Sequence, residues 1–119
     1  MTQEEIKMIL NKTMGYFDKY SVVELYAHIQ AYRRALRMES NSKVSFSYAL
    51  DCYINDVFYP VMIHLTENKI LKQIVRKYGL SYAYLIITEC LLDSKKLTRD
   101  EYLSKVSFRT EDIKKKIAA

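Results

Sequence analysis

Glycine and proline are scarce in this sequence of 119 residues, which contains two glycines and one proline. A β-sheet of several strands needs many tight turns, and glycine and proline are among the residues that such turns use most. Apolar residues with helical spacing recur along the chain instead. The composition therefore predicts an all-α fold, a compact single-domain bundle of about six to seven short helices that spans residues 1–119.

Long apolar runs are missing, and cysteines are few. No segment holds the roughly 20 consecutive apolar residues that a membrane-spanning helix needs, and no apolar leader with a cleavage site is present. The two cysteines, Cys52 and Cys90, fall on apolar helix faces, where inert buried thiols are expected. We therefore expect a cytoplasmic protein that does not associate with a membrane.

Clusters of catalytic or metal-binding side chains are also missing. The two histidines, His28 and His64, stand among apolar neighbours, and no His or Cys pair has the spacing of two ligands on one helix face. A catalytic site would have to gather Asp51, Asp56, His64 or Glu89 in one cleft, and no base and nucleophile stand at a suitable spacing. The sequence predicts a protein that is not an enzyme and that binds no cofactor or metal.

Capping residues and apolar periodicity mark the expected helices. Thr2 precedes a first amphipathic helix that should end near Gly15. Ser21 and Glu24 form an S-x-x-E capping box, which predicts the start of a second helix that should end near Met38.

A third helix is expected from Ser45, because apolar residues recur at i, i+3, i+4 and i+7 between residues 46 and 65. Pro60 lies inside this pattern. Proline lacks the N–H that would bond to the carbonyl of Asp56, so the helix is expected to be kinked or broken at Pro60.

The most apolar part of the chain is residues 80–92, LSYAYLIITECLL. Thr66 or Asn68 is expected to cap the helix before it, and Gly79 to end that helix as the left-handed residue of a Schellman motif. Ser81 is expected to cap the apolar helix itself. A helix that is apolar on most of its circumference should be buried, so we expect the other helices to pack around this one.

Eleven tyrosines are the unusual feature of the composition. Helical spacing places four of them at core or half-buried positions, namely Tyr26, Tyr32, Tyr53 and Tyr78. Five others are hard to place inward, because neighbouring residues already fill the inner face, and exposed tyrosines favour interfaces. The predicted partner-binding residues are therefore Tyr48, Tyr59, Tyr82, Tyr84 and Tyr102.

The net charge of +5 is unevenly distributed. Residues 44–68 carry three acidic and no basic groups, whereas residues 69–96 carry six basic and two acidic groups. Arg33, Arg34 and Arg37 add a basic side to the second helix. A moderate basic excess is compatible with nucleic acid or an acidic protein as the partner.

One segment resembles a helix-turn-helix. In residues 72–91, KQIVRKYGLSYAYLIITECL, Val75 stands at the small apolar position of the first helix, Gly79 at the turn and Leu85 at the buried position of the second helix. The resemblance implies two sets of contacts with DNA. The phosphate contacts would be Lys72, Arg76 and Lys77, and the side chains near base edges would be Tyr82, Ala83, Tyr84 and Thr88.

The same segment departs from that motif at three positions. Thr88 stands where a large apolar residue is usual, and Ile86 and Ile87 fill exposed positions that would hold Arg, Asn or Gln in a recognition helix. These departures favour a buried helical hairpin over a DNA-reading one.

Two functions remain as hypotheses. The first is a non-enzymatic protein-interaction module, a regulator or inhibitor that forms a homodimer and uses tyrosine-rich and basic helix faces. A composition rich in Lys, Ile, Asn and Tyr would suit an origin in a phage or plasmid. The alternative is a nucleic-acid-binding transcriptional regulator that uses six basic residues, namely Arg33, Arg34, Arg37, Lys72, Arg76 and Lys77.

Overall fold

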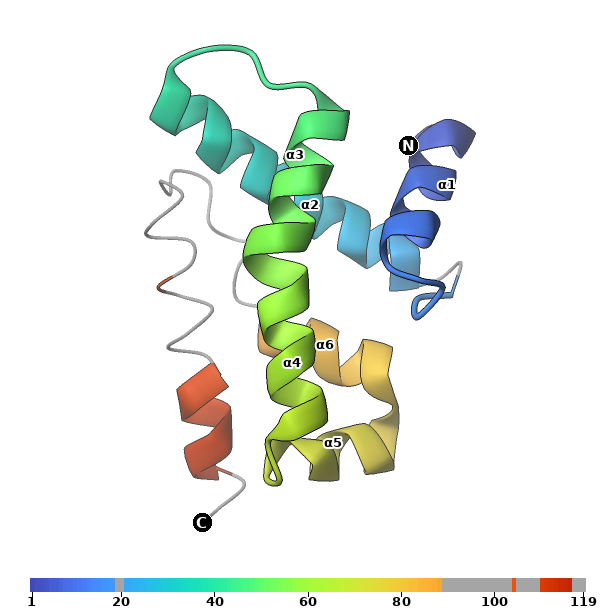
Figure 1. Cartoon of the computed structure of the whole chain (residues 1–119), viewed down its shortest axis with the longest axis vertical. Helices are drawn as coiled ribbons and strands as arrows, with labels where there is room; N and C mark the ends of the chain where they lie inside the picture. Colours follow the sequence, from blue (N-terminus) through green and yellow to red (C-terminus); the bar gives the residue numbers. More distant parts are fainter. Residues whose placement is uncertain (19–20, 89–103, 105–109, 117–119) are drawn as a thin grey trace.

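The protein is an all-α bundle, as the sequence predicts (Figure 1). The computed structural model describes residues 1–18, 21–88, 104 and 110–116. Within these residues no strand occurs, and residues 110–116 are also helical. The elements in chain order are α1 (Gln3–Lys12), α2 (Ser21–Ser40), α3 (Phe46–Tyr53), the π-helical segment η1 (Ile54–Phe58), α4 (Tyr59–Glu67), α5 (Leu71–Tyr78) and α6 (Leu80–Thr88).

Short-range capping contacts set several of the helix starts. The Thr2 hydroxyl accepts a hydrogen bond from the Glu5 amide, and the Glu5 carboxylate accepts one from the Thr2 amide, which makes a complete capping box for α1. Ser45 accepts from the Tyr48 amide at the start of α3. Asn68 accepts from the amides of Ile70 and Leu71 before α5. The predicted caps Thr2 and Asn68 are confirmed, and Ser45, where the third helix was expected to start, is also a cap.

The predicted capping box at the start of α2 is wrong. The amide of Ser21 donates to a carboxylate oxygen of Asp18 at 2.7 Å, and the amide of Asp18 donates to the Ser21 hydroxyl at 3.0 Å. Asp18 and Ser21 therefore form the reciprocal pair that was expected of Ser21 and Glu24. The pair has the same three-residue spacing as the predicted one, but it satisfies the amides of Asp18 and Ser21 instead of those of Ser21 and Glu24.

Pro60 changes the hydrogen bonding of its helix without ending it. Residues 46–67 run through α3, η1 and α4 without a break (Figure 1), and the Tyr59 amide donates to the carbonyl of Ile54, five residues back. The wider π turn lies directly before Pro60, at the place where an α-helical hydrogen bond to Asp56 would need the missing N–H. The break that was one of the two predicted outcomes at Pro60 does not occur, and the predicted kink stays a prediction.

Helix α6 lies against the rest of the bundle, as its apolar sequence indicates. It contacts α2, α4 and α5, and its Ala83, Tyr84 and Ile87 are completely buried. The rings of Phe17, Phe58 and Tyr84 meet in a cluster whose centroids lie 5.4–6.1 Å apart. This cluster joins three parts of the chain in one core: the segment after α1, the continuous helix formed by α3, η1 and α4, and helix α6.

Candidate functional site

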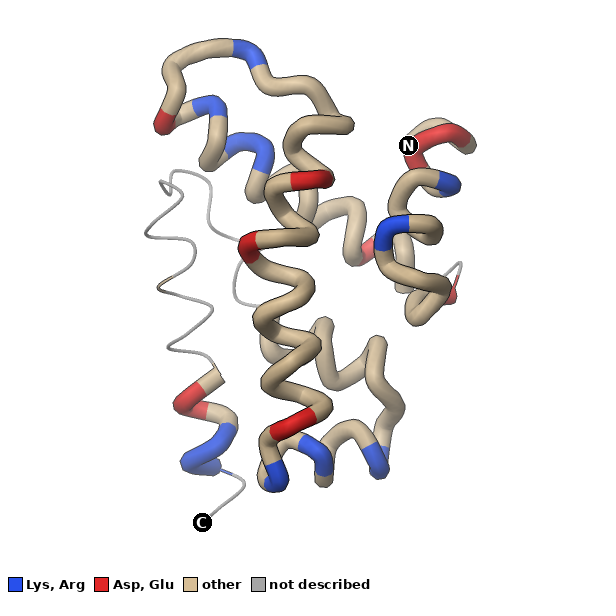
Figure 2. The backbone as a smooth tube through the Cα atoms, in the orientation of Figure 1, with Lys and Arg blue, Asp and Glu red and all other residues tan. Residues whose placement is uncertain are grey.

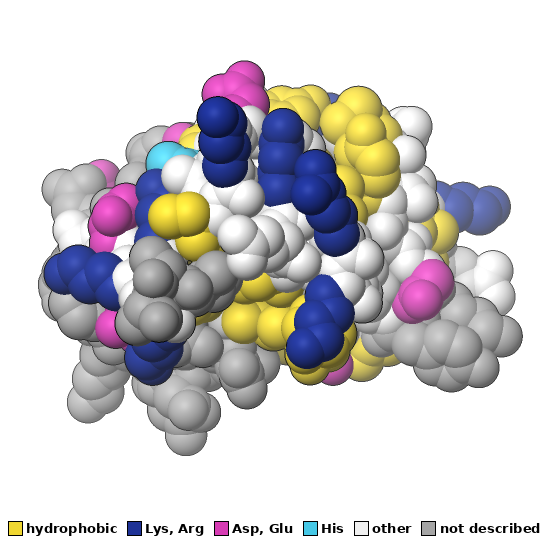
Figure 3. Space-filling model, turned by 90° about the horizontal axis from the view of Figure 1, so that it is seen from below, with side chains coloured by type: hydrophobic (Ala, Val, Ile, Leu, Met, Phe, Trp, Pro, Cys, Tyr) yellow, Lys and Arg dark blue, Asp and Glu magenta, His cyan; other side chains and the backbone are white. Residues whose placement is uncertain are grey.

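Helix α5 has one apolar and one basic side. Leu71 is buried, and Ile74 and Val75 pack partly buried against the core. Four basic residues lie on this helix and in the turn before it, namely Lys69, Lys72, Arg76 and Lys77 (Figure 2). None of the four forms an ion pair with a carboxylate of the described residues. The end of the molecule that α5 covers therefore carries basic side chains that pair with no carboxylate among the described residues (Figure 3).

Two exposed tyrosines pack against each other beside these cations. The rings of Tyr78 and Tyr82 have centroids 5.0 Å apart with an angle of 38° between their planes. The side chains are 52% and 51% exposed, and the Lys77 ammonium lies 5.2 Å from the Tyr78 ring centroid. We call the surface made by Lys69, Lys72, Arg76, Lys77, Tyr78 and Tyr82 the α5 face. Its combination of exposed aromatic area and positive charge is typical of binding surfaces.

Gly79 brings the two tyrosines together. Its amide donates to the Val75 carbonyl at 2.8 Å, and its carbonyl accepts from the Ala83 amide at 3.1 Å. Its φ of +92° is positive, as predicted, but its ψ of 162° is extended rather than left-handed helical, so the turn differs from the predicted Schellman motif. As a result α6 begins at Leu80, immediately after Gly79, and Ser81 lies inside the helix rather than before it.

The structure does not place α6 as a recognition helix. Ala83, Tyr84 and Thr88, which the helix-turn-helix resemblance brings close to base edges, are all completely buried. Of that group only Tyr82 is exposed. Ile87 on the same helix is also completely buried, and full burial of such a side chain stabilises a fold by roughly 1.5–3 kcal/mol.

The predicted partner-binding tyrosines divide into three groups. Tyr48, Tyr59 and Tyr82 are 58%, 42% and 51% exposed, as expected. The prediction for Tyr84 is wrong, since this side chain is completely buried and shares a hydrogen bond with the Tyr53 hydroxyl. Tyr102 lies outside the described residues, as do Glu89 and Cys90.

Tyr78 was missed as a surface residue because its spacing from Leu71 is that of an inward position. It is the last residue of α5, and the chain turns at Gly79, so no following helical turn covers it. Proximity to a glycine that ends a helix is the sequence signal that could have indicated its exposure.

The two predicted groups of basic residues lie at opposite ends of the molecule. Arg33, Arg34 and Arg37 belong to the C-terminal half of α2, far along the long axis from α5 (Figure 2). The six cations therefore do not form one continuous surface, and a single DNA duplex contact using all of them is not supported by this arrangement.

The described residues considered for catalysis, Asp51, Asp56 and His64, do not form a catalytic cluster. Asp51 forms an ion pair with Lys12 at 3.2 Å, and Asp56 accepts a hydrogen bond of 2.5 Å from the Tyr32 hydroxyl. His64 is exposed on α4. Within the described part of the chain, no three His, Cys, Asp or Glu side chains are close enough together to hold a metal ion.

Two core residues have strongly shifted pKa values. Burial lowers the pKa of His28 from 6.5 to about 4, because the charged imidazolium would lose its hydration. Burial, and next to it the proximity of Tyr84, raises the pKa of Tyr53 well above its usual value of 10.0. Both groups are therefore neutral at physiological pH, and both are remote from solvent.

No protein-family model, curated protein or solved structure matches this chain. Among the helices that the structure describes, none combines the length and the apolar character required to cross a membrane.

Proposed function

We propose that this protein is a non-enzymatic interaction module that binds an acidic protein surface through the α5 face. The proposal is carried by the contact between Tyr78 and Tyr82, two half-exposed rings at the end of the basic helix α5, with the Lys77 ammonium 5.2 Å from the Tyr78 ring centroid. Tyrosine supplies a large rigid contact area at a low cost in conformational entropy, and residues of this type dominate binding energies at interfaces. A protein that catalyses no reaction can act on its partner by covering part of the partner's surface, so the proposed role is that of a regulator or inhibitor.

A second copy of the chain is the first partner to test. Residues 44–68 contain Asp51, Asp56 and Glu67 and no Lys or Arg, and the helix they form also exposes Tyr48 and Tyr59. This helix is complementary in charge to the α5 face. If each copy places its α5 face on the acidic helix of the other, the two reciprocal contacts would close the homodimer proposed here and would give the exposed tyrosines of both surfaces a role.

Light scattering coupled to size exclusion tests this directly. We expect a dimer at low salt that dissociates as salt rises, because exposed charges are screened beyond about 3 Å at 1 M salt. The variant Arg76→Glu should be monomeric, whereas Arg34→Glu, which changes a basic residue at the other end of the molecule, should remain dimeric. A monomeric wild-type protein at about 100 µM would contradict self-association with a Kd near 10 µM.

Binding of nucleic acid through the basic residues of α5 is the alternative function. The cations of α5 would then contact phosphates without reading bases, because α6 is buried. Stacking of unpaired bases would require uncovered ring faces, whereas Tyr78 already packs against Tyr82 and Lys77. A gel shift at about 50 mM salt that disappears in the Arg76→Gln, Lys77→Gln double variant would favour this alternative over a protein partner.

A further inference from the structure

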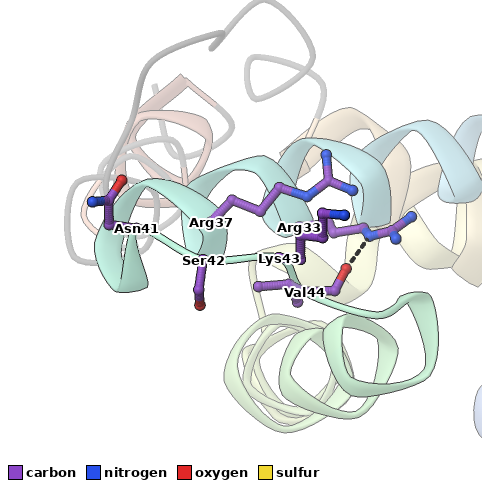
Figure 4. Close-up of a pocket in the computed structure, with 6 residues that line it drawn as sticks. All are labelled: Arg33, Arg37, Asn41, Ser42, Lys43 and Val44. Carbon is purple, nitrogen blue, oxygen red and sulfur yellow. Dashed lines mark hydrogen bonds between the residues drawn. The ribbon is translucent and has the colours of Figure 1, made fainter.

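A recess at the end of α2 has a lining that suits an anion. It has a volume of about 650 Å³ and is lined by Arg33, Arg37, Asn41, Ser42, Lys43 and Val44 (Figure 4). The two arginines extend from α2, and the remaining residues belong to the turn that follows and to the segment that returns beside the helix (Figure 4). We call this recess the α2 pocket. Its six lining residues include three cations and two uncharged hydrogen-bonding side chains.

Arg33 is held in a defined orientation. Its Nε donates a hydrogen bond of 2.7 Å to the Val44 carbonyl, and its Nη1 lies 3.4 Å from Oε1 of Gln30 (Figure 4). Because Nε is used for this contact, the guanidinium group is fixed in position while its terminal nitrogens still have donors to offer. A guanidinium oriented before the ligand arrives loses little side-chain entropy on binding.

The positive charge of the α2 pocket is not neutralised by the described residues. None of Arg33, Arg37 and Lys43 forms an ion pair with a carboxylate among them. The C-terminal end of α2 contributes only about half a negative charge, against three full positive charges. A doubly charged anion in the pocket would therefore be attracted by all three side chains at once.

The backbone turn brings Lys43 to the arginines. Asn41 has a φ of +53°, the left-handed conformation that reverses the chain just after α2. The reversal carries Ser42, Lys43 and Val44 back along the helix, so that residues far from one another on a straight helix line one recess. Val44 is almost completely buried and forms an apolar part of the lining.

We propose that the α2 pocket binds a small phosphate monoester. Two arginines and a lysine match the charge of a phosphate dianion. The volume exceeds that of a phosphate group alone and falls within the range of about 300–1,000 Å³ that small-molecule sites occupy. The organic part of the ligand would lie against Val44 and the aliphatic part of Arg33. This site is independent of the α5 face.

NMR titrations test the proposal. The backbone amide shifts of the protein are recorded while one of three probes is added, namely inorganic phosphate, adenosine monophosphate or adenosine. At about 50 mM salt, we expect the nucleotide and inorganic phosphate to shift the amides of residues 41–44 and adenosine to leave them unchanged. Arg37→Gln and Lys43→Gln should each weaken binding about tenfold or more, the usual effect of removing a hydrogen bond to a charged group.

Arg34→Gln is the matched control, because Arg34 lies on the same helix and does not line the pocket. Its affinity should equal that of the wild-type protein, and all variants should retain the wild-type helical circular dichroism. The proposal is overturned if neither phosphate probe shifts residues 41–44 at concentrations up to about 10 mM. It is also overturned if Arg34→Gln weakens binding as much as Arg37→Gln does, since binding would then reflect general attraction of anions to a basic helix.

Discussion

The hydroxyl groups of Tyr53 and Tyr84 share a hydrogen bond inside the core, although 31 residues separate the two side chains in the sequence. Tyr53 lies at the end of α3 and Tyr84 in the middle of α6, and both side chains are completely buried. A buried hydroxyl needs a partner because water cannot supply one. This hydrogen bond pairs two buried polar groups and joins α3 to α6.

Removing either hydroxyl of this pair should destabilise the fold. We expect Tyr53→Phe and Tyr84→Phe each to lower the free energy of unfolding by about 1–3 kcal/mol, since each leaves the other hydroxyl without this partner. The double variant should lose less than the sum of the two, which a double-mutant cycle by urea denaturation would measure. Tyr59→Phe, at an exposed tyrosine, serves as the control and should change stability by less than about 0.5 kcal/mol. Strictly additive losses would show that the two hydroxyls do not interact.

Acid should destabilise the protein through His28. The pKa of this residue is about 4 in the folded protein and 6.5 in the unfolded chain, so the unfolded state binds more protons between these values. Stability should therefore be unaffected by His28 above about pH 7 and fall as the pH drops from 6.5 to 4, by about 3 kcal/mol in total.

The pH dependence of unfolding by urea measures this effect. His28→Gln should remove this part of the fall in stability with acid, whatever its effect at neutral pH, because glutamine does not titrate. His64→Gln, at the exposed histidine of α4, should keep the wild-type pH dependence. If the stability of His28→Gln falls between pH 6.5 and 4 as much as that of the wild-type protein, His28 is not the cause of the fall.

Substitution of Gly79 should destabilise the fold, because its backbone conformation is one that other residues disfavour. A Cβ at this position would meet no atom within 4 Å, so space is available, but φ of +92° with ψ of 162° is a conformation that side chains other than glycine disfavour. We expect Gly79→Ala to lower the free energy of unfolding by about 1–3 kcal/mol. Gln73→Ala, at an exposed position of α5, should change it by less than about 0.5 kcal/mol. Equal denaturation midpoints for the two variants would show that the turn adapts without strain.

The Tyr78–Tyr82 contact should matter for binding much more than for folding. Both rings are about half exposed, so Tyr78→Ala and Tyr82→Ala should each cost less than about 1 kcal/mol of stability. Each should weaken self-association by at least about tenfold, as removal of an aromatic hot spot does. Sedimentation velocity across a concentration series gives the dimer Kd. Tyr16→Ala, at an exposed tyrosine after α1, should leave that Kd unchanged. If Tyr16→Ala raises the Kd as much as Tyr78→Ala does, the α5 face is not the dimer interface.

The fold class and most helix positions could be predicted because they depend on neighbours in the sequence. Thr2 with Glu5, Ser45 with Tyr48 and Asn68 with Leu71 are contacts across three residues, so a local pattern contains both partners. The burial of α6 also follows from its own composition, which is apolar on most of the helix surface. Even the error at the start of α2 is local, since Asp18 and Glu24 are equivalent choices of partner for Ser21 until the backbone is known.

The candidate sites could be predicted only in part. Tyr82 and Tyr84 are two residues apart in the same helix and both are hard to place by spacing, yet one is exposed and the other is completely buried. The difference depends on Tyr53 and Phe58, which lie on another helix. Likewise, Arg37 and Lys43 share a recess with Arg33 because Asn41 reverses the chain, a conformation that composition alone did not indicate.

The sequence by itself determined that this chain is helical, roughly where most of the helices lie and which of them is apolar enough to be buried, because these properties arise from interactions within a few residues. Only the tertiary structure decided which tyrosines face solvent, which cations share a surface and that Ala83, Tyr84 and Thr88 of α6 are buried. Those outcomes depend on contacts between helices, and the sequence spacing along one helix contains no information about which neighbour covers each side.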